Sequence, residues 1–219
     1  MSPITTQPAM LKINIITLFP DLFEPFKNVL PLNRAIQENL FVLNIINLRD
    51  YAIDKRGTVD DRPYGGGTGM ILRVEPIVNA LNTLQKSHTI LLSPRGTKFN
   101  QQKAKEFAKL NEFTIICGRY EGVDARIEEF YTDETISIGD FVLSGGETAA
   151  IAIVEATVRL LEGIFDKEGV TENDSHSRYY FEHPQYTRPE EFEGHKVPNV
   201  LLSGDHAEIE KWKATNSSS

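Results

Sequence analysis

The sequence predicts an α/β fold, in which a parallel sheet is covered by helices on both faces. Short apolar runs alternate with helical patterns along most of the chain, and the apolar residues in each run are consecutive instead of at every second position. Such runs are typical of strands buried on both faces, as in parallel sheets between two layers of helices. Glycine-rich loops follow the later runs, and with 219 residues the chain can bury this core without covalent links.

The expected strands and helices follow one another in order. β-Branched and aliphatic residues predict strands over residues 12–19, 41–48, 89–92, 113–117 and 135–138. Helix starts are marked by side chains that accept hydrogen bonds from free backbone N–H groups, or by proline in the first turn. One helix is expected to start from a cap at Asp21, and a second to run from Pro76 to about Lys86. Two more are expected from a cap at Asn100 to Leu110 and from a cap at Asp124 to about Phe130. The last is expected from Glu147 to Leu161.

We expect four parts along the chain. Residues 1–9 form a loose N-terminal extension, with Met10 a plausible start, and residues 10–161 form the α/β domain. Residues 162–186 are predicted to be a flexible linker, because charged residues and glycine replace the apolar periodicity over most of it. Residues 187–219 are predicted to form a small helical domain.

Composition limits the classes of function. A net charge of -8 argues against indiscriminate nucleic-acid binding, because such binding depends on neutralising phosphates, although a local basic patch is compatible with it. The single cysteine, Cys117, can form no internal disulfide, which favours a reducing, cytoplasmic setting, and its place in an apolar run predicts a buried side chain. Residues 147–165 carry Glu147, Glu155 and Arg159, so this apolar stretch is interpreted as a buried helix and no membrane span is expected.

Three glycine-rich segments mark the candidate site. They cover residues 62–70, 117–122 and 137–147, and the last two follow strands at their carboxyl ends, where open α/β sheets bind ligands. None has the Gly-Lys-Ser/Thr ending of a phosphate-binding loop, so a nucleotide hydrolase is the weaker alternative. Because glycine is costly to order, three such loops on one scaffold predict one composite site.

Six blocks of sequence stand in a fixed order along the chain: RPYGGGTGM (62–70), LSPRG (92–96), CGRYEG (117–122), SIGDFVLSGGE (137–147), HPQYTRP (183–189) and LLSGDHAEI (201–209). Together they resemble the bacterial tRNA (guanine-N1)-methyltransferase family, TrmD, of the SPOUT class. The resemblance covers residues 12–212 and implies a deep trefoil knot, a rare exception to the rule that chains are unknotted. It also implies a cytoplasmic homodimer with both active sites at the interface.

The resemblance implies that S-adenosyl-L-methionine donates a methyl group to N1 of guanosine 37 of tRNA, next to the anticodon. Backbone groups are expected to hold the adenosine, because its edges can reach N–H and C=O groups only where side chains are small. The cofactor-binding positions carried over are Leu92, Ser93, Pro94, Gly118, Tyr120, Glu121, Gly122, Ile138, Gly139, Phe141, Val142, Leu143, Ser144, Gly145 and Gly146.

The same resemblance assigns catalysis to Asp174 and Arg159. N1 must lose its proton before its lone pair can attack the methyl group, and a carboxylate suits this task. From the residues alone, Glu172 and Asp166 would be equal candidates. A direct pair with Arg159 would make Asp174 a weaker base, so we expect Arg159 at guanine O6, where negative charge develops. Asp174 is expected to act beside the cofactor pocket of the opposite subunit, from a linker that orders over the bound substrates.

No metal site is predicted, although the family implies magnesium dependence at an unknown position. The histidines of the last quarter, His176, His183, His195 and His206, match no zinc spacing, and no cysteine accompanies them. Residues 187–219 are expected to bind tRNA and are shorter than the tail usual in the family. The alternative function is a non-catalytic S-adenosylmethionine-binding or RNA-binding SPOUT protein, against which Asp174 and Arg159 argue.

Overall fold

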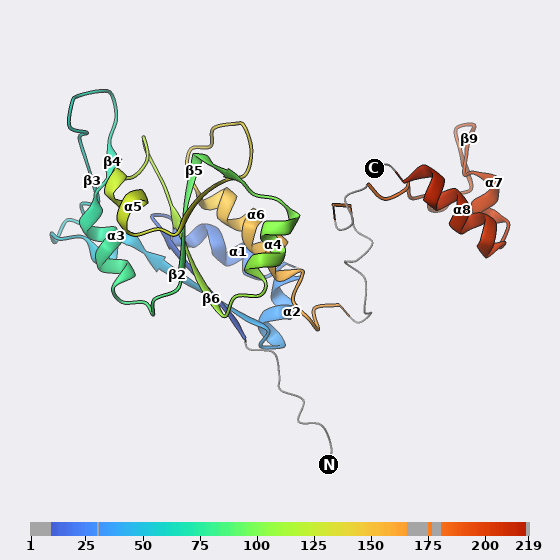
Figure 1. Cartoon of the computed structure of the whole chain (residues 1–219), viewed down its shortest axis with the longest axis horizontal. Helices are drawn as coiled ribbons and strands as arrows, with labels where there is room; N and C mark the ends of the chain where they lie inside the picture. Colours follow the sequence, from blue (N-terminus) through green and yellow to red (C-terminus); the bar gives the residue numbers. More distant parts are fainter. Residues whose placement is uncertain (1–9, 30, 166–174, 177–180, 218–219) are drawn as a thin grey trace, which may run out of the picture. The chain divides into compact units, whose positions relative to one another are not determined.

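The computed structural model describes residues 10–29, 31–165, 175–176 and 181–217 (Figure 1). The chain divides into two compact units, residues 1–166 and 167–219. The first unit contains the sheet, and the second contains a small hairpin and two helices. The finer division into four parts stays a prediction.

A five-stranded sheet with the order β2-β1-β6-β5-β7 forms the centre of the first unit. Every neighbouring pair in it is parallel, so the predicted α/β class with a parallel sheet is confirmed. The order departs from the sequence, because β6 lies between β1 and β5. The strands are β1 (Leu11–Thr17), β2 (Phe41–Asn47), β5 (His88–Lys98), β6 (Glu112–Cys117) and β7 (Glu134–Ser137), and they correspond to the five that the sequence predicts.

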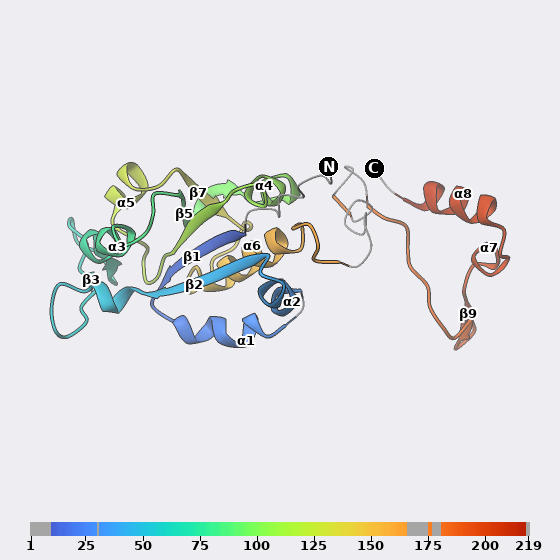
Figure 2. The same ribbon diagram turned by 90° about the horizontal axis from the view of Figure 1, so that it is seen from below.

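Helices cover both faces of this sheet. Ile115 and Ile116 are neighbours in β6, yet they belong to two separate hydrophobic clusters, as alternation along a strand requires. The first cluster includes residues of α2 (Leu32–Gln37), α4 (Gln101–Phe107) and α6 (Glu147–Val158). The second includes residues of α3 (Val74–Leu81) and α5 (Ala125–Phe130). Figure 2 shows α1 (Glu24–Lys27) and α2 on the same side of β1 and β2.

Two of the three predicted helix caps are confirmed. The side chain of Asn100 accepts a hydrogen bond from the N–H of Lys103, and that of Asp124 accepts one from the N–H of Arg126. The cap predicted at Asp21 is wrong. A 3-10 helix, η1 (Pro20–Phe23), begins one residue earlier, because proline at a first helical position already has the required φ.

Strand β5 is longer than the sequence predicts and pairs with β7 in two stretches. Leu92 and Thr97 both face Ile136 of β7, with an irregularity in register between them. Gly96 lies in this irregularity, where a Cβ atom would come within 2.5 Å of the backbone nitrogen of Ile136. Glycine is therefore required where the two backbones approach this closely.

The region between β2 and α3 contains three short elements. They are η2 (Leu48–Tyr51), β3 (Asp60–Asp61) and β4 (Ile71–Leu72), of which β3 and β4 pair antiparallel. The glycine-rich segment of residues 62–70 therefore joins the two strands of a small hairpin. No helix within the described ranges is long and apolar enough to cross a membrane.

The second unit contains a hairpin that the sequence analysis does not predict. Strands β8 (Glu191–Phe192) and β9 (His195–Lys196) pair antiparallel through Glu193 and Gly194, whose φ angles are 51° and 84°. Helices α7 (Asn199–Leu202) and α8 (His206–Asn216) follow it. The ring of Trp212 in α8 lies edge-on to the rings of His183 and Tyr186, at 5.9 and 6.2 Å between centroids.

Candidate active site

A cavity of about 540 Å³ lies at the carboxyl ends of β6 and β7 and at the end of the first stretch of β5 that pairs with β7. Its lining comes from three stretches of chain, within residues 91–95, 118–128 and 136–149. The volume falls in the range of roughly 300–1,000 Å³ that is typical of small-molecule sites. The carboxyl ends of parallel strands are where open α/β sheets bind ligands, so this cavity is the candidate site.

The cavity gathers almost all the residues predicted to bind the cofactor. Gly139 does not line it, although its neighbour Ile138 does. That these residues bind S-adenosyl-L-methionine stays a prediction. The predicted residues in the lining are Leu92, Ser93, Pro94, Gly118, Tyr120, Glu121, Gly122, Ile138, Phe141, Val142, Leu143, Ser144, Gly145 and Gly146.

Two of the lining loops are in direct backbone contact. The N–H of Gly146 donates a hydrogen bond to the carbonyl of Gly118 at 2.9 Å, and Arg119 and Gly145 form an isolated antiparallel bridge. A Cβ atom at Gly146 would lie 2.9 Å from the Cα of Cys117. The glycine at position 146 is therefore explained by backbone packing against the end of β6, before any ligand is considered.

The prediction of one composite site from three glycine loops holds for two of them. The cavity lining contains no residue of the segment 62–70. That segment instead contacts a lining residue, Glu121. The N–H of Glu121 donates to the carbonyl of Met70 at 3.0 Å, and a Cβ atom at Gly69 would lie 2.7 Å from Cγ of Glu121. The first glycine loop therefore supports a lining residue from outside the cavity.

A buried carboxylate lies beside the cavity, at the first residue of α6. The Glu147 side chain is 1% exposed, and the hydroxyl of Thr17 donates to its Oε1 at 2.8 Å. Nε of Arg119 donates to Oε2, also at 2.8 Å. No sequence pattern assigns a role to this pair. An acid inside an apolar helix, with an arginine in a neighbouring block, is the signal that could have suggested it.

Two further charged residues of the lining were not predicted as site residues. Nη2 of Arg95 donates to Oε2 of Glu128 at 3.2 Å, and the hydroxyl of Thr135 donates to Oε1 at 3.0 Å. Arg95 lies in the LSPRG block, whereas Glu128 lies on α5, outside all six blocks. The cavity therefore has charged groups of both signs at its edge.

Cys117 ends β6 beside this site and is buried, as the sequence predicts. Burial raises the pKa of its thiol well above the ordinary value, and the negative charge of Glu147 raises it further. A protonated thiol is a poor nucleophile, so the surroundings of Cys117 favour a packing role.

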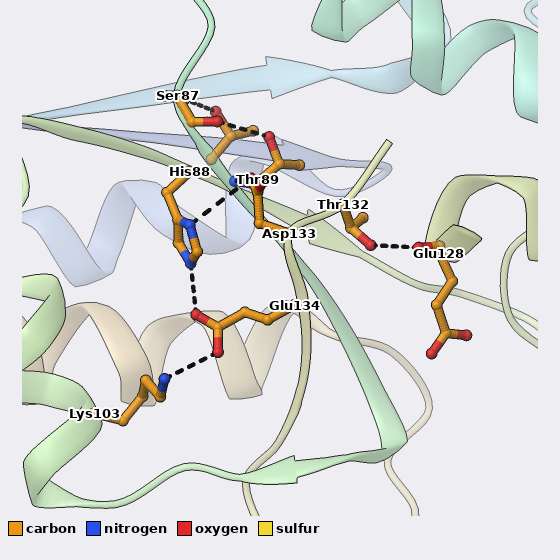
Figure 3. Close-up of polar contacts among 9 residues, drawn as sticks. Ser87, His88, Thr89, Lys103, Glu128, Thr132, Asp133 and Glu134 are labelled. Carbon is orange, nitrogen blue, oxygen red and sulfur yellow. Dashed lines mark hydrogen bonds and ion pairs between the residues drawn. The ribbon is translucent and has the colours of Figure 1, made fainter. Parts of the chain in front are cut away.

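A second polar cluster lies at the amino ends of β5 and β7, away from the cavity (Figure 3). Nε2 of His88 lies 2.6 Å from Oε1 of Glu134, and Nζ of Lys103 lies 3.1 Å from Oε2 of the same carboxylate. The N–H of Thr89 donates to the carboxylate of Asp133 at 2.7 Å. These contacts join the starts of the two strands whose far ends carry the cavity.

The structure describes one of the two predicted catalytic residues, Arg159. Arg159 is the C-cap residue of α6, whose first turn borders the cavity. Asp174 lies outside the described residues, as do the alternative acids Glu172 and Asp166. Among the described residues, no group of three or more His, Cys, Asp or Glu side chains could hold a metal ion, so no magnesium position is assigned.

Together, the parallel sheet and the cavity at its strand ends define an α/β protein with a cavity of small-molecule size beside closely packed glycine loops. The chain belongs to the tRNA (Guanine-1)-methyltransferase TrmD family, whose sequence model matches residues 11–219.

Curated relatives agree with this family over most of their length. A protein of a Sulfurihydrogenibium species is 51% identical over 207 residues, which are 93% of this chain and 81% of the relative. Proteins of Carboxydothermus hydrogenoformans and Lactobacillus helveticus are 45% and 47% identical, and the matches cover 83% and 84% of their chains and 94% and 93% of this one. All three are named tRNA (guanine-N(1)-)-methyltransferase.

Proposed function

We propose that this chain transfers a methyl group from S-adenosyl-L-methionine to N1 of guanosine 37 of tRNA, with the donor bound in the cavity at the ends of β5, β6 and β7. Family membership supports the reaction: the chain is a tRNA (guanine-N1)-methyltransferase, and a methyltransferase of this family takes its methyl group from S-adenosyl-L-methionine. The observation that supports the location is the cavity itself, because it collects all but one of the predicted donor-binding residues.

The shape of the cavity wall suits the adenosine part of the donor. Phe141, Val142 and Leu143 line the cavity but keep 53%, 84% and 40% of their surface exposed. Backbone N–H and C=O groups of the segment 138–143 are the proposed partners of the edges of adenine, while apolar side chains cover its faces. Within this segment the N–H and C=O of Gly139 already bond to the hydroxyl of Ser137. We assign adenine to this segment and the methionine part to the rest of the cavity.

The exposed apolar wall also supports a homodimer. Monomeric proteins rarely leave large neighbouring apolar side chains in water, and Tyr120 adds a further half-exposed ring to the same wall.

The position of Arg159 agrees with a homodimer. Helix α6 has 12 residues, so its two ends are about 18 Å apart at a rise of 1.5 Å per residue. This separation supports a role for Arg159 at the cavity of a second copy instead of its own.

Asp174 and Arg159 carry the chemistry in this proposal. The carboxylate of Asp174 takes the proton from N1, the N1 lone pair forms a bond to the methyl carbon, and the electrons of the C–S bond pass to sulfur. The products are N1-methylguanosine in tRNA and S-adenosylhomocysteine. An aspartate has an ordinary pKa of roughly 3.9, which makes it a weak base, so stabilisation of the developing O6 charge by Arg159 is needed.

We also infer the trefoil knot of the family, built from the segments 92–96, 118–122 and 137–146. The close approach of Gly96 to the backbone of Ile136, and the two-part pairing of β5 with β7, support it.

We assign tRNA binding to the second unit, where Lys196 and Lys211 are exposed. Both substrates of the reaction occur in the cytoplasm, where we place the protein.

The experiment that tests this function measures methyl transfer from labelled S-adenosyl-L-methionine to tRNA transcripts. We expect N1-methylguanosine in transcripts with guanosine at position 37, identified after nuclease digestion, and none in transcripts with adenosine there. Absence of transfer to the first transcript, or equal transfer to both, would contradict the proposal.

The role of Asp174 is tested by Asp174→Asn, with Glu172→Gln as the control at a neighbouring acid of the same segment. Loss of a general base typically costs about 10²–10⁴-fold in rate, so we expect at least a 100-fold fall in kcat for Asp174→Asn. The affinity for S-adenosylhomocysteine should be unchanged, and Glu172→Gln should keep its rate within about twofold. If the two variants were equally active, the base would be another group.

A further inference from the structure

We propose that Arg119 is a positioning residue of the donor site: through its ion pair with buried Glu147, it holds the loop of residues 141–146 against the loop of residues 118–122. The inference rests on the proposed binding of S-adenosyl-L-methionine between these loops. Arg119 acts here through its neighbours, because its guanidinium is occupied by protein groups.

The anchor of this arrangement is the carboxylate of Glu147. Its side chain is 1% exposed, and both of its oxygens have partners, Thr17 on one and Arg119 on the other, each at 2.8 Å. A buried carboxylate without a partner is strongly unfavourable, so the pair fixes the Arg119 side chain against the start of α6. The arginine side chain is itself only 20% exposed.

The same guanidinium also reaches the second loop. While Nε donates to Glu147, Nη1 donates to the carbonyl of Ser144 at 3.3 Å. The backbone of Arg119 forms a bridge with Gly145, and the Gly146 N–H donates to the carbonyl of Gly118. The planar fork of an arginine can make two such bonds from one rigid group, whereas a lysine ammonium offers a single nitrogen.

An aromatic ring holds the guanidinium from another side. The central carbon of the Arg119 guanidinium lies 4.3 Å from the centroid of the Phe19 ring. Such cation–π contacts favour a guanidinium near a ring face. Thr17, which binds Glu147, is the last residue of β1, and Phe19 lies two residues after it. The anchor therefore ties both cavity loops to the end of β1.

The consequence for the cavity lies in the residues after Arg119. Tyr120 has a φ of 60°, which is uncommon for a residue other than glycine, and the Gly122 N–H donates to the carbonyl of Arg119 at 3.0 Å. The turn that presents Tyr120 and Glu121 to the cavity thus begins at the anchored arginine. Loosening Arg119 is expected to release both this turn and the Ser144 backbone.

The test measures the affinity of the full chain for S-adenosylhomocysteine by calorimetry, with Arg119→Lys as the variant. Lysine keeps the positive charge beside Glu147 but lacks the rigid fork with which the guanidinium spans Glu147 and Ser144. We expect a Kd at least about tenfold higher than that of the parent chain. The matched control is Arg126→Lys, because Arg126 makes a similar two-bond pair with Asp124 outside the cavity lining. Its Kd should stay within about twofold.

A second variant separates positioning from stability. In Arg119→Met with Glu147→Met, the buried charges are replaced by apolar side chains, an exchange that usually preserves stability. We expect a thermal midpoint close to that of the parent and an affinity that remains at least about tenfold weaker. Parent-like affinity in Arg119→Lys or in the double variant would overturn the inference. Absence of binding to the parent chain would instead contradict the donor site itself.

Discussion

Gly96 and Ile136 lie in backbone contact, at the place where β5 leaves its pairing with β7 and resumes it. A Cβ atom on Gly96 would come within 2.5 Å of the Ile136 nitrogen and 2.6 Å of its carbonyl carbon. Both neighbours are backbone atoms of a sheet strand, so neither can move aside without breaking pairs in the register of β5 and β7. This contact gives the first prediction.

Gly96→Ala is expected to lower the free energy of unfolding by about 1–3 kcal/mol or more, as forced overpacking does. Urea denaturation measures the change. Gly118→Ala is the control for stability, since its Cβ would meet the Leu92 carbonyl oxygen at an ordinary 3.4 Å. Equal stability of the two variants would show that the contact between Gly96 and Ile136 is not as close as described.

Gly69→Ala is expected to weaken binding of S-adenosylhomocysteine by displacing Glu121 from the cavity wall. Gly69 has a φ of +97°, so alanine also strains the backbone by about 1 kcal/mol or more. The control is Gly65→Ala, at a φ of +85° with no atom within 4 Å of the added Cβ. Both variants should lose similar stability, while calorimetry should show weaker binding in Gly69→Ala alone. Unchanged affinity in Gly69→Ala would separate this loop from the site.

The thiol of Cys117 is expected to be unreactive in the folded protein. Burial and the charge of Glu147 raise its pKa, so the folded state keeps the proton that the unfolded state loses above its ordinary pKa of 9.0. The stability that this group contributes is therefore present below that pH and decreases as the pH rises above it. A thiol reagent at pH 8 should label Cys117 slowly in buffer and rapidly in urea. Equal rates would contradict its burial.

Asp124 is expected to stabilise the protein through its charge and its cap. Its pKa is lowered, first by the hydrogen bond with Arg126, so its stabilisation is present at neutral pH and is lost as the pH falls through the lowered pKa. Asp124→Ala should lose about 1 kcal/mol of unfolding free energy at pH 7, as the loss of a helix cap does. Asp124→Asn keeps a cap acceptor and should lose less. Denaturation at pH 7 and pH 3 measures the loss of stability in both variants. Equal losses in Asp124→Ala and Asp124→Asn would exclude the capping role.

The strands of this protein could be predicted because burial on both faces leaves a local mark in the sequence. Residues 113–117, for example, are apolar except for Thr114, which neither a helix surface nor a half-exposed strand requires. The caps at Asn100 and Asp124 were also predictable from nearby residues, because a capping side chain and the N–H group that donates to it lie within one turn. Proline at position 20 competed with Asp21 and moved the helix start.

Contacts between distant parts of the chain left no such mark. The second stretch of β5 depends on its pairing with β7, and the pair of Arg119 with Glu147 joins residues 28 positions apart. The hairpin of β8 and β9 was predictable in principle, because Glu193 and Gly194 form a two-residue turn that favours glycine. The residues proposed to bind the donor were predicted through the resemblance to the family. Close backbone packing explains part of the glycine pattern on which that resemblance rests.

The most direct measurement of the central claim is a crystal structure of the full chain with S-adenosylhomocysteine. We predict the ligand in the cavity at the ends of β5, β6 and β7, with the edges of adenine bonded to backbone groups of the segment 138–143. A ligand found elsewhere on the protein, with this cavity empty, would contradict the account.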